Sequence, residues 1–176
     1  MKKQELISQL CNSKNNFIFG LASLALLTDP DARNLLNEKS ADFSGYSVSF
    51  DQVAALLGSE IDRQIALEEF AKSVLRCLLK EGHELVTDYC KREGLYSDLS
   101  AQSWWQFSRL IRNALSHNFC FRLNDKDMKL LPLSWQGKTI DASVDGQPLM
   151  MSFFGYAEAW CLFLEYETFV LGLSSQ

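Results

Sequence analysis

The chain has 176 residues, of which 47% are hydrophobic and 22% charged, and its formal net charge at pH 7 is −5. This length suits one domain with a substantial core, and the composition excludes an intrinsically disordered chain. The negative charge argues against a protein that coats nucleic acid, which usually carries a basic patch. It leaves room for an enzyme that holds one phosphate with a few local arginines.

The first helix is expected over residues 4–27, because Asp29-Pro30 disfavours its continuation. Its most apolar part, residues 17–27, has about half the roughly 20 residues that a membrane-spanning helix needs. A signal peptide is a poor fit, because the preceding stretch is polar and contains Glu5. We therefore interpret residues 17–27 as the inner face of a core helix and expect no membrane association.

A longer helical region is expected after a polar connection at residues 31–47, which includes a short helix around residues 32–37. The region begins near Phe50, is broken at Gly58-Ser59 and ends at Gly94. Apolar residues recur there at helical steps, which indicates one buried face. These residues are Ile61, Ile65, Phe70, Val74, Leu78 and Leu85.

A third helix is expected over residues 101–118, followed by short apolar segments at 128–133, 138–140 and 147–151. The turn signals Gln136-Gly137 and Asp145-Gly146 between these segments favour a small hairpin or meander. The last helix, about 153–171, is rich in aromatic residues. Together these elements predict an all-α fold in one domain, residues 1–176. It is an antiparallel helical bundle with a small β-hairpin insertion before the last helix.

The five cysteines are scattered, at Cys11, Cys77, Cys90, Cys120 and Cys161, and no two have CxxC spacing. The two histidines lie far apart in the sequence. This distribution is typical of reduced thiols in the cytosol and not of a zinc site or a disulfide framework. There is also no glycine-rich phosphate loop and no acidic cluster. We therefore expect a cytoplasmic protein without a metal and without a cofactor.

The third helix has two distinct faces when residues 102–117 are placed at about 100° per residue. A stripe that should face the core contains Trp104, Phe107, Leu110, Ile111, Ala114 and Leu115. The opposite face contains Gln102, Gln106, Arg109, Arg112, Asn113, Ser116 and His117. Trp105 is expected near this polar face and outside the core stripe.

The polar face lacks the Lys and Glu that cover most solvent-exposed helices. Its two arginines offer forks of donors suited to phosphate, and His117 is able to exchange a proton near neutral pH. Such groups suit cleavage of a phosphodiester. An alternative stays open, in which His117 interacts with the carboxyl end of the helix dipole and the arginines pair with acids of the second helical region.

The end of this helix, residues 112–117, reads RNALSH and resembles the R-x(4–6)-H motif of the HEPN superfamily, in which a polar residue often follows the arginine. The resemblance extends to the helical organisation of most of the chain, but only about a dozen residues are specific. It implies a bundle that dimerises so that the motif helices of two subunits face each other. Members with an intact motif are often metal-independent ribonucleases with a composite site at that interface.

The resemblance implies that Arg112 and His117 form the catalytic pair and that Asn113 is their polar companion. His117 would act on the ribose 2′-OH or the leaving 5′-oxygen, while Arg112 stabilises the charged phosphorane. We add Arg109, Ser116 and Trp105 as candidate phosphate-binding or substrate-binding residues, because they lie on or near the same face.

Two other functions remain open. One is a non-catalytic dimeric HEPN module that binds a nucleotide or a partner protein, for example in a toxin–antitoxin or defence system with an antitoxin protein. The other is a regulatory helical bundle without a small ligand. His83, among charged residues of the second helical region, is interpreted as solvent-exposed. One aromatic cluster is interpreted as core and not as a platform for stacking bases; its members are Trp104, Phe153, Phe154, Trp160, Phe163 and Phe169.

Overall fold

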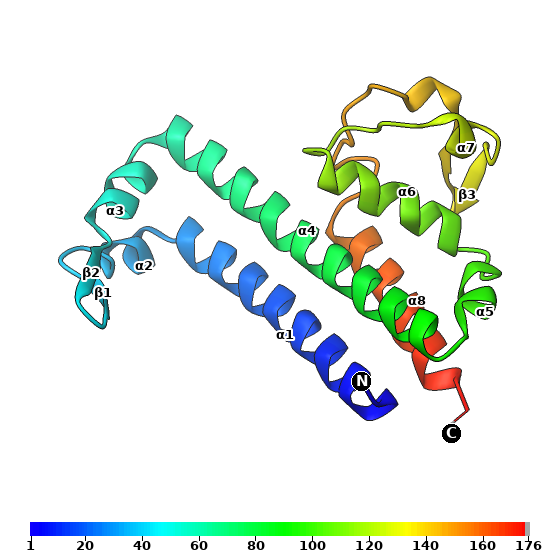
Figure 1. Ribbon diagram of the computed structural model, residues 1–176. Coiled ribbons are helices and arrows are strands. Elements are labelled where there is room, and N and C mark those ends of the chain that lie inside the picture. Colours follow the sequence, from blue (N-terminus) through cyan, green and yellow to red (C-terminus); the bar gives the residue numbers. More distant parts are fainter. Residues whose placement is uncertain (175–176) are drawn as a thin grey trace. The chain divides into compact units, whose positions relative to one another are not determined.

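A computed structural model describes residues 1–174 (Figure 1). This part of the chain is 65% helical and forms a bundle of eight helices with two small antiparallel β-hairpins, one of them before the last helix. The predicted helical bundle and the hairpin that precedes its last helix are therefore confirmed. Within residues 1–174, no helix is both long enough and apolar enough to cross a membrane.

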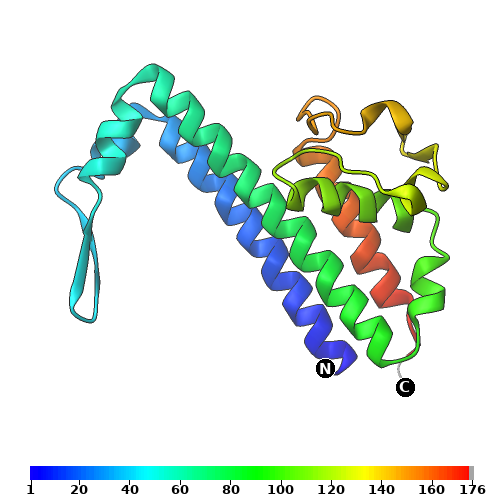
Figure 2. The ribbon, with the colours of Figure 1, turned by 45° about the horizontal axis from the view of Figure 1, so that its top comes forward.

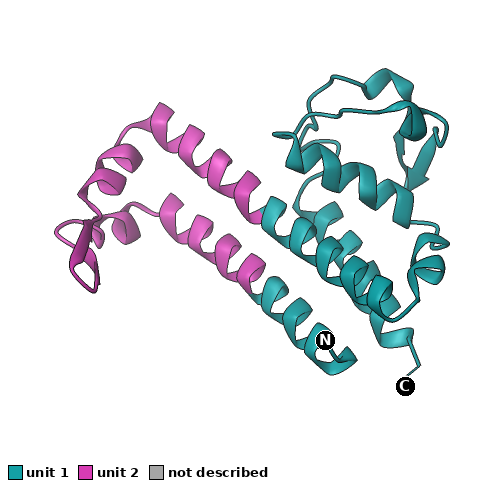
Figure 3. Ribbon diagram, in the orientation of Figure 1, with its two compact units in different colours: residues 1–15, 75–176 teal, residues 16–74 magenta. Residues whose placement is uncertain are grey.

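The chain divides into two compact units (Figure 3). Unit 1 comprises residues 1–15 and 75–176, and unit 2 comprises residues 16–74. Two long helices run through both units, α1 (Lys3–Thr28) and α4 (Glu60–Arg92).

Unit 1 contains the first part of α1, the second part of α4 and the chain after α4. Its further elements are α5 (Tyr96–Ser100), α6 (Trp105–Ser116), α7 (Asp125–Met128), β3 (Leu133–Trp135), β4 (Lys138–Ile140) and α8 (Tyr156–Gly172), with a 3₁₀ turn at Ala142–Val144. In Figures 1 and 2 the unit 1 part of α4 runs beside both α1 and α8, and α6 crosses over α8.

The core of unit 1 lies between these helices. Among the described residues, 27 of the 30 buried hydrophobic side chains belong to it. Polar contacts tie α1 to its neighbours. Lys14 pairs with Glu167 of α8 at 2.6 Å, Lys3 donates to the carbonyl oxygen of Leu171 of α8 at 3.1 Å, and Ser13 donates to Glu81 of α4 at 2.9 Å. The apolar stripe predicted for residues 104–115 is buried in this core.

The β3–β4 hairpin follows from its turn sequence. Trp135 pairs with Lys138, and the two residues between them, Gln136 and Gly137, have φ values of 45° and 76°. Two consecutive positive φ angles are what a tight two-residue hairpin turn requires, and glycine adopts them readily. The third apolar segment, 147–151, forms only an isolated bridge, between Pro148 and Cys120.

Unit 2 contains the second part of α1, the first part of α4 and the segment between them. That segment holds α2 (Pro30–Asn34), β1 (Ser40–Phe43), β2 (Tyr46–Ser49) and α3 (Asp51–Gly58). Asp29 caps α2, because its carboxylate accepts hydrogen bonds from the backbone N–H groups of Asp31 at 2.7 Å and Ala32 at 3.1 Å. The break predicted at Gly58-Ser59 is confirmed.

The prediction for residues 31–47 was wrong in part, because they hold the first strand and the start of the second strand of a hairpin. Phe43 pairs with Tyr46 across a two-residue loop in which Gly45 has a φ of 90°. The Ser44-Gly45 dipeptide is a turn signal, and apolar residues alternate on both sides of it. Every residue of the hairpin except Ala41 is exposed, so its pattern does not mark a buried face.

The interpretation of residues 17–27 as the inner face of a core helix was also wrong. Phe17 is buried, but Phe19 is 75% and Leu26 is 62% exposed. The apolar stripe of α4 is divided in the same way, since Ile61 is 71% exposed and Leu78 is buried. Apolar residues on one face of a helix indicate that the face needs cover, but the neighbour that would cover it does not follow from the sequence.

Candidate functional site

The residues singled out from the sequence lie on or beside α6 in unit 1. This helix ends where the N–H of His117 donates to the carbonyl oxygens of Asn113 at 3.0 Å and Ala114 at 3.1 Å. Asn118 and Phe119 then adopt φ values of 55° and 56°. Asparagine tolerates this left-handed conformation, whereas for phenylalanine it costs of order 1–2 kcal/mol. The packed surroundings of the buried Phe119 ring therefore hold the chain at the end of α6 in a specific path.

Arg112 is held at the surface by an acid of α4. Its Nη2 donates to Oε1 of Glu84 at 2.6 Å, and its Nη1 donates to Oδ1 of Asn113 at 3.4 Å. The Nε atom of Arg112 is buried and has no hydrogen-bond partner among the described residues. The Glu84 side chain is 46% exposed, so this pair lies at the boundary with solvent. Such pairs contribute little to stability, about 0–1 kcal/mol.

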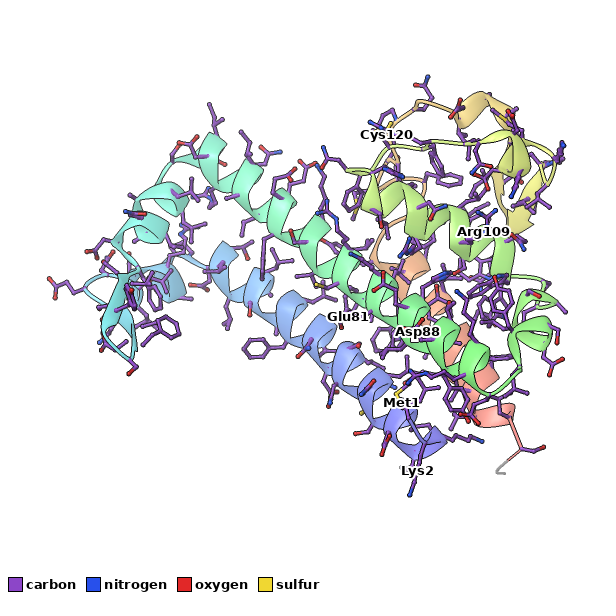
Figure 4. The ribbon with its side chains drawn as sticks, viewed as in Figure 1. Met1, Lys2, Glu81, Asp88, Arg109 and Cys120 are labelled. Atoms are coloured by element: carbon purple, nitrogen blue, oxygen red, sulfur yellow. The ribbon has the colours of Figure 1, made fainter. Side chains whose placement is uncertain are left out.

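Arg109, which is labelled in Figure 4, is also paired, but with a buried acid. Its Nη2 donates to Oδ1 of Asp127 at 2.6 Å, and its Nε donates to Gln106 at 2.9 Å. Asp127 is 1% exposed and also accepts the N–H of Asn124 at 3.1 Å, in the capping box of α7. This guanidinium therefore joins α7 to α6 and neutralises a buried carboxylate, which makes Arg109 a structural residue in the free chain.

The prediction that Trp105 lies near the polar face is wrong, because this side chain is buried with only 1% of its surface exposed. Its ring stacks on the imidazole of His83, with centroids 4.5 Å apart and planes 7° from parallel. His83 is therefore also buried, which corrects its interpretation as solvent-exposed. The sequence contains a signal for this position, because His83 lies four residues after Leu79 and three before Val86, both buried on α4.

The environment of His83 keeps its imidazole neutral. Burial lowers the pKa of His83 to about 3, and the positive charges of Arg112, Arg109 and Lys91 add to this effect. Its Nδ1 atom has no hydrogen-bond partner among the described residues, and neither has Nε1 of Trp105. His83 is buried and stacked on Trp105, so its contribution to this region is packing.

Ser116 and His117 are exposed at the end of α6, and Asn113 is half-buried beside Arg112. Arg112 and His117 are five residues apart, which places them about 140° apart around the helix. No hydrogen bond joins them within the described residues. One chain therefore brings Arg112 together with Asn113 and Glu84, and leaves the His117 ring open to solvent.

Sequence reasoning missed two acids of this region, Glu84 and Asp127. The alternative that the arginines pair with acids of the second helical region is confirmed for Arg112, which meets Glu84 of α4. It is wrong for Arg109, which pairs with Asp127 of α7. Across residues 1–174, no group of three or more His, Cys, Asp or Glu side chains is arranged to hold a metal ion.

A hollow of about 940 Å³ lies elsewhere in unit 1. It is bordered by the first turn of α1, the end of α4 and the residues after α8, including Lys3, Ile7, Tyr89, Glu93 and Leu173. None of the candidate site residues lines it.

No protein-family model, curated protein or solved structure matches this chain. The resemblance to the HEPN superfamily therefore depends on the residues of α6 and on the helical organisation.

Proposed function

We propose that the chain is a HEPN-type, metal-independent endoribonuclease whose site is completed when two copies bring their α6 helices together. The observation that carries this proposal is the end of α6, where the polar residues Arg112, Asn113, Ser116 and His117 are half-buried or exposed while the apolar stripe of the same helix is buried. Arg112 and His117 do not meet within one chain. A second copy related by a twofold axis would place the arginine of one subunit near the histidine of the other.

In this proposal His117 moves the proton at the ribose 2′-OH or at the leaving 5′-oxygen, and Arg112 stabilises the charge on the phosphorane. Glu84 forms an ion pair with Arg112 in the free protein, so the phosphate of the substrate has to displace the Glu84 carboxylate. The exposure of the Arg112–Glu84 pair makes this exchange inexpensive. The Asn113 amide, 3.4 Å from Arg112 Nη1, keeps the guanidinium oriented during the exchange.

The test is to incubate the purified protein with mixed RNA in EDTA, beside Arg112→Ala and His117→Ala. We expect cleavage by the wild type and a loss of about 100-fold or more in each variant, as for removal of a proton-transfer or charge-stabilising group. Arg122→Ala is the matched control, because Arg122 is an exposed arginine outside α6. Equal loss in this control would point to general electrostatic binding of RNA.

Glu84→Gln sharpens the test. It removes the charge that competes with the phosphate while keeping a side chain of the same shape. We expect tighter RNA binding and cleavage at least as fast as the wild type. A monomer in light scattering at the concentrations where RNA is cleaved would contradict the composite site.

A second candidate function is a non-catalytic dimeric module that binds a nucleotide or a partner protein. The observation that favours it is that both arginines of α6 already have carboxylate partners. In this case the protein dimerises without cutting RNA, and a nucleotide raises its melting temperature.

A further inference from the structure

The exposed side of α1 in unit 2 is an apolar face. Ile18 and Phe19 are exposed there together with Leu26, and Ala22 and Ala25 lie between them. At about 100° per residue, these five side chains fall within an arc of roughly 120°. We call this set of five residues the α1 face. No charged residue occurs between Lys14 and Asp29, so the face is apolar along its whole length.

The shape of the α1 face suits another helix. Its members recur at steps of three, four and seven residues, which is the spacing at which a helix presents anchors to a partner helix. The small Ala22 and Ala25 lie between larger side chains, so a second helix axis is able to approach closely along the middle. The large side chains of this face stay half or more exposed: Ile18 is 50%, Phe19 75% and Leu26 62% exposed.

Unit 2 as a whole exposes more apolar surface than unit 1. Among the described residues, 12 of the 18 large hydrophobic side chains that are exposed lie in unit 2, and only three of the 30 buried ones do. Monomeric proteins rarely leave large contiguous apolar patches in water, and such patches commonly mark interaction sites.

The charge of unit 2 identifies the kind of partner. Its sequence has nine Asp and Glu against four Lys and Arg, whereas unit 1 has thirteen of each. The whole net charge of −5 therefore belongs to residues 16–74. Asp29 and Asp31, directly after the α1 face, form no ion pair within residues 1–174, and neither does Asp62 of α4.

This charge disfavours three occupants. RNA and anionic lipid would be repelled, and a second unit 2 would bring a further charge of −5 against the first. A protein surface with apolar and basic residues complements both the apolar α1 face and the negative charge of unit 2.

We propose that the α1 face is a docking site for an amphipathic helix of a partner protein, whose apolar side is bordered by Lys and Arg. The apolar side of the partner helix covers Ile18, Phe19 and Leu26, and its basic border meets the acids of unit 2. The α1 face contains no residue of α6, so this proposal holds whether or not the protein cuts RNA.

The probes are two synthetic helical peptides of roughly 18 residues with the same leucine positions, one with Lys and one with Glu at all other positions. Binding of each labelled peptide to the full chain is measured by fluorescence anisotropy. We expect the Lys peptide to bind and the Glu peptide to bind at least about tenfold more weakly, with the affinity of the Lys peptide falling as salt rises.

The variant that tests the face combines Ile18→Gln, Phe19→Gln and Leu26→Gln. The fold should tolerate it because these side chains are exposed, and circular dichroism checks this. We expect its dissociation constant for the Lys peptide to rise at least about tenfold. Leu130→Gln with Met150→Gln is the matched control, because these two apolar residues are exposed in unit 1. The control should bind like the wild type.

Several results would overturn the proposal. One is the absence of binding by the Lys peptide, and another is equal binding of both peptides or of the triple variant. A wild-type dimer that the triple variant converts into a monomer in light scattering would assign the face to a second copy. Binding of the chain to phosphatidylglycerol vesicles, lost in the triple variant, would assign it to a membrane.

Discussion

The two parts of α4 differ sharply although they belong to one continuous helix. In unit 2 the residues Ile61 and Ile65 are exposed, whereas in unit 1 Leu75 and Leu79 are completely buried. The apolar residues recur at helical spacing in both parts. Periodicity therefore identifies the face of a helix that needs cover, and tertiary packing decides whether the same chain provides it.

The two units also differ in charge and in the kind of ligand that we propose for each. Unit 1 has a dense core, balanced charge and the exposed end of α6, where we place an RNA site. Unit 2 has few buried residues, an acidic surface and the α1 face, where we place a protein partner. Stability is expected to be concentrated in unit 1, because burial of apolar side chains is the main favourable contribution to folding.

The largest expected effect comes from truncating one phenylalanine in each unit. Phe163 of α8 is completely buried, so Phe163→Ala should lower the free energy of unfolding by about 3–5 kcal/mol. Phe19 is 75% exposed, and Phe19→Ala should change it by less than about 0.5 kcal/mol. Urea unfolding followed by circular dichroism measures both variants, since the helices of both units contribute to that signal. Comparable losses in the two variants would show that the α1 face is covered in solution.

Much of the fold was predictable because local signals and packing agree. Gly58-Ser59 separates α3 from α4, and Gly94, with a φ of 71°, follows the end of α4. Gln136-Gly137 forms the turn of β3–β4. In these places the residue type limits the backbone whatever its neighbours are.

The candidate site was less predictable, because its pairs join residues far apart in the sequence. The amphipathic pattern of α6 correctly separates a buried stripe from a polar face. It does not show that Glu84, 28 residues before Arg112, or Asp127, 18 residues after Arg109, supplies the opposing charge. Trp105 was misplaced for the same reason, because α4 brings His83 over a ring that the wheel of α6 alone leaves outside the core.

The second prediction uses pH to weaken unit 1 alone, since both histidines lie there and unit 2 has none. Burial lowers the pKa of His83 to about 3, from 6.5 in the unfolded chain. The unfolded chain therefore binds more protons between these two pH values, and stability is lost as the pH falls through this window. Between pH 7 and pH 5 we expect His83 to lower the free energy of unfolding by about 2 kcal/mol.

His83→Phe should reduce this dependence, because phenylalanine keeps a ring against Trp105 and does not titrate. His117→Gln is the matched control and should retain it. The measurement is urea unfolding of the three proteins at pH 7 and pH 5, followed by tryptophan fluorescence. The same loss of stability in His83→Phe as in the wild type would show that other groups, and not His83, cause the acid sensitivity.

The smallest expected effect comes from replacing two crowded glycines, Gly82 in unit 1 and Gly20 in unit 2, by alanine. A methyl group at Gly82 would lie 2.8 Å from the Phe163 ring and 3.0 Å from the Tyr166 ring. Both rings are completely buried in the core of unit 1. Gly82→Ala should therefore lower the free energy of unfolding by about 1–2 kcal/mol, even after the roughly 1 kcal/mol that alanine gains over glycine in a helix. A methyl group at Gly20 would lie equally close, 2.8 Å, to Val74 in unit 2.

Val74 is only half-buried, so it is able to shift, and the helix preference of alanine should offset the crowding. Gly20→Ala should therefore leave the free energy of unfolding within about 0.5 kcal/mol of the wild type. Urea unfolding followed by circular dichroism reports both units and compares the two variants directly. If Gly20→Ala destabilised the protein as much as Gly82→Ala, the contact between α1 and α4 in unit 2 would be as rigid as the core of unit 1. The difference between the two units would then be one of exposure and charge alone.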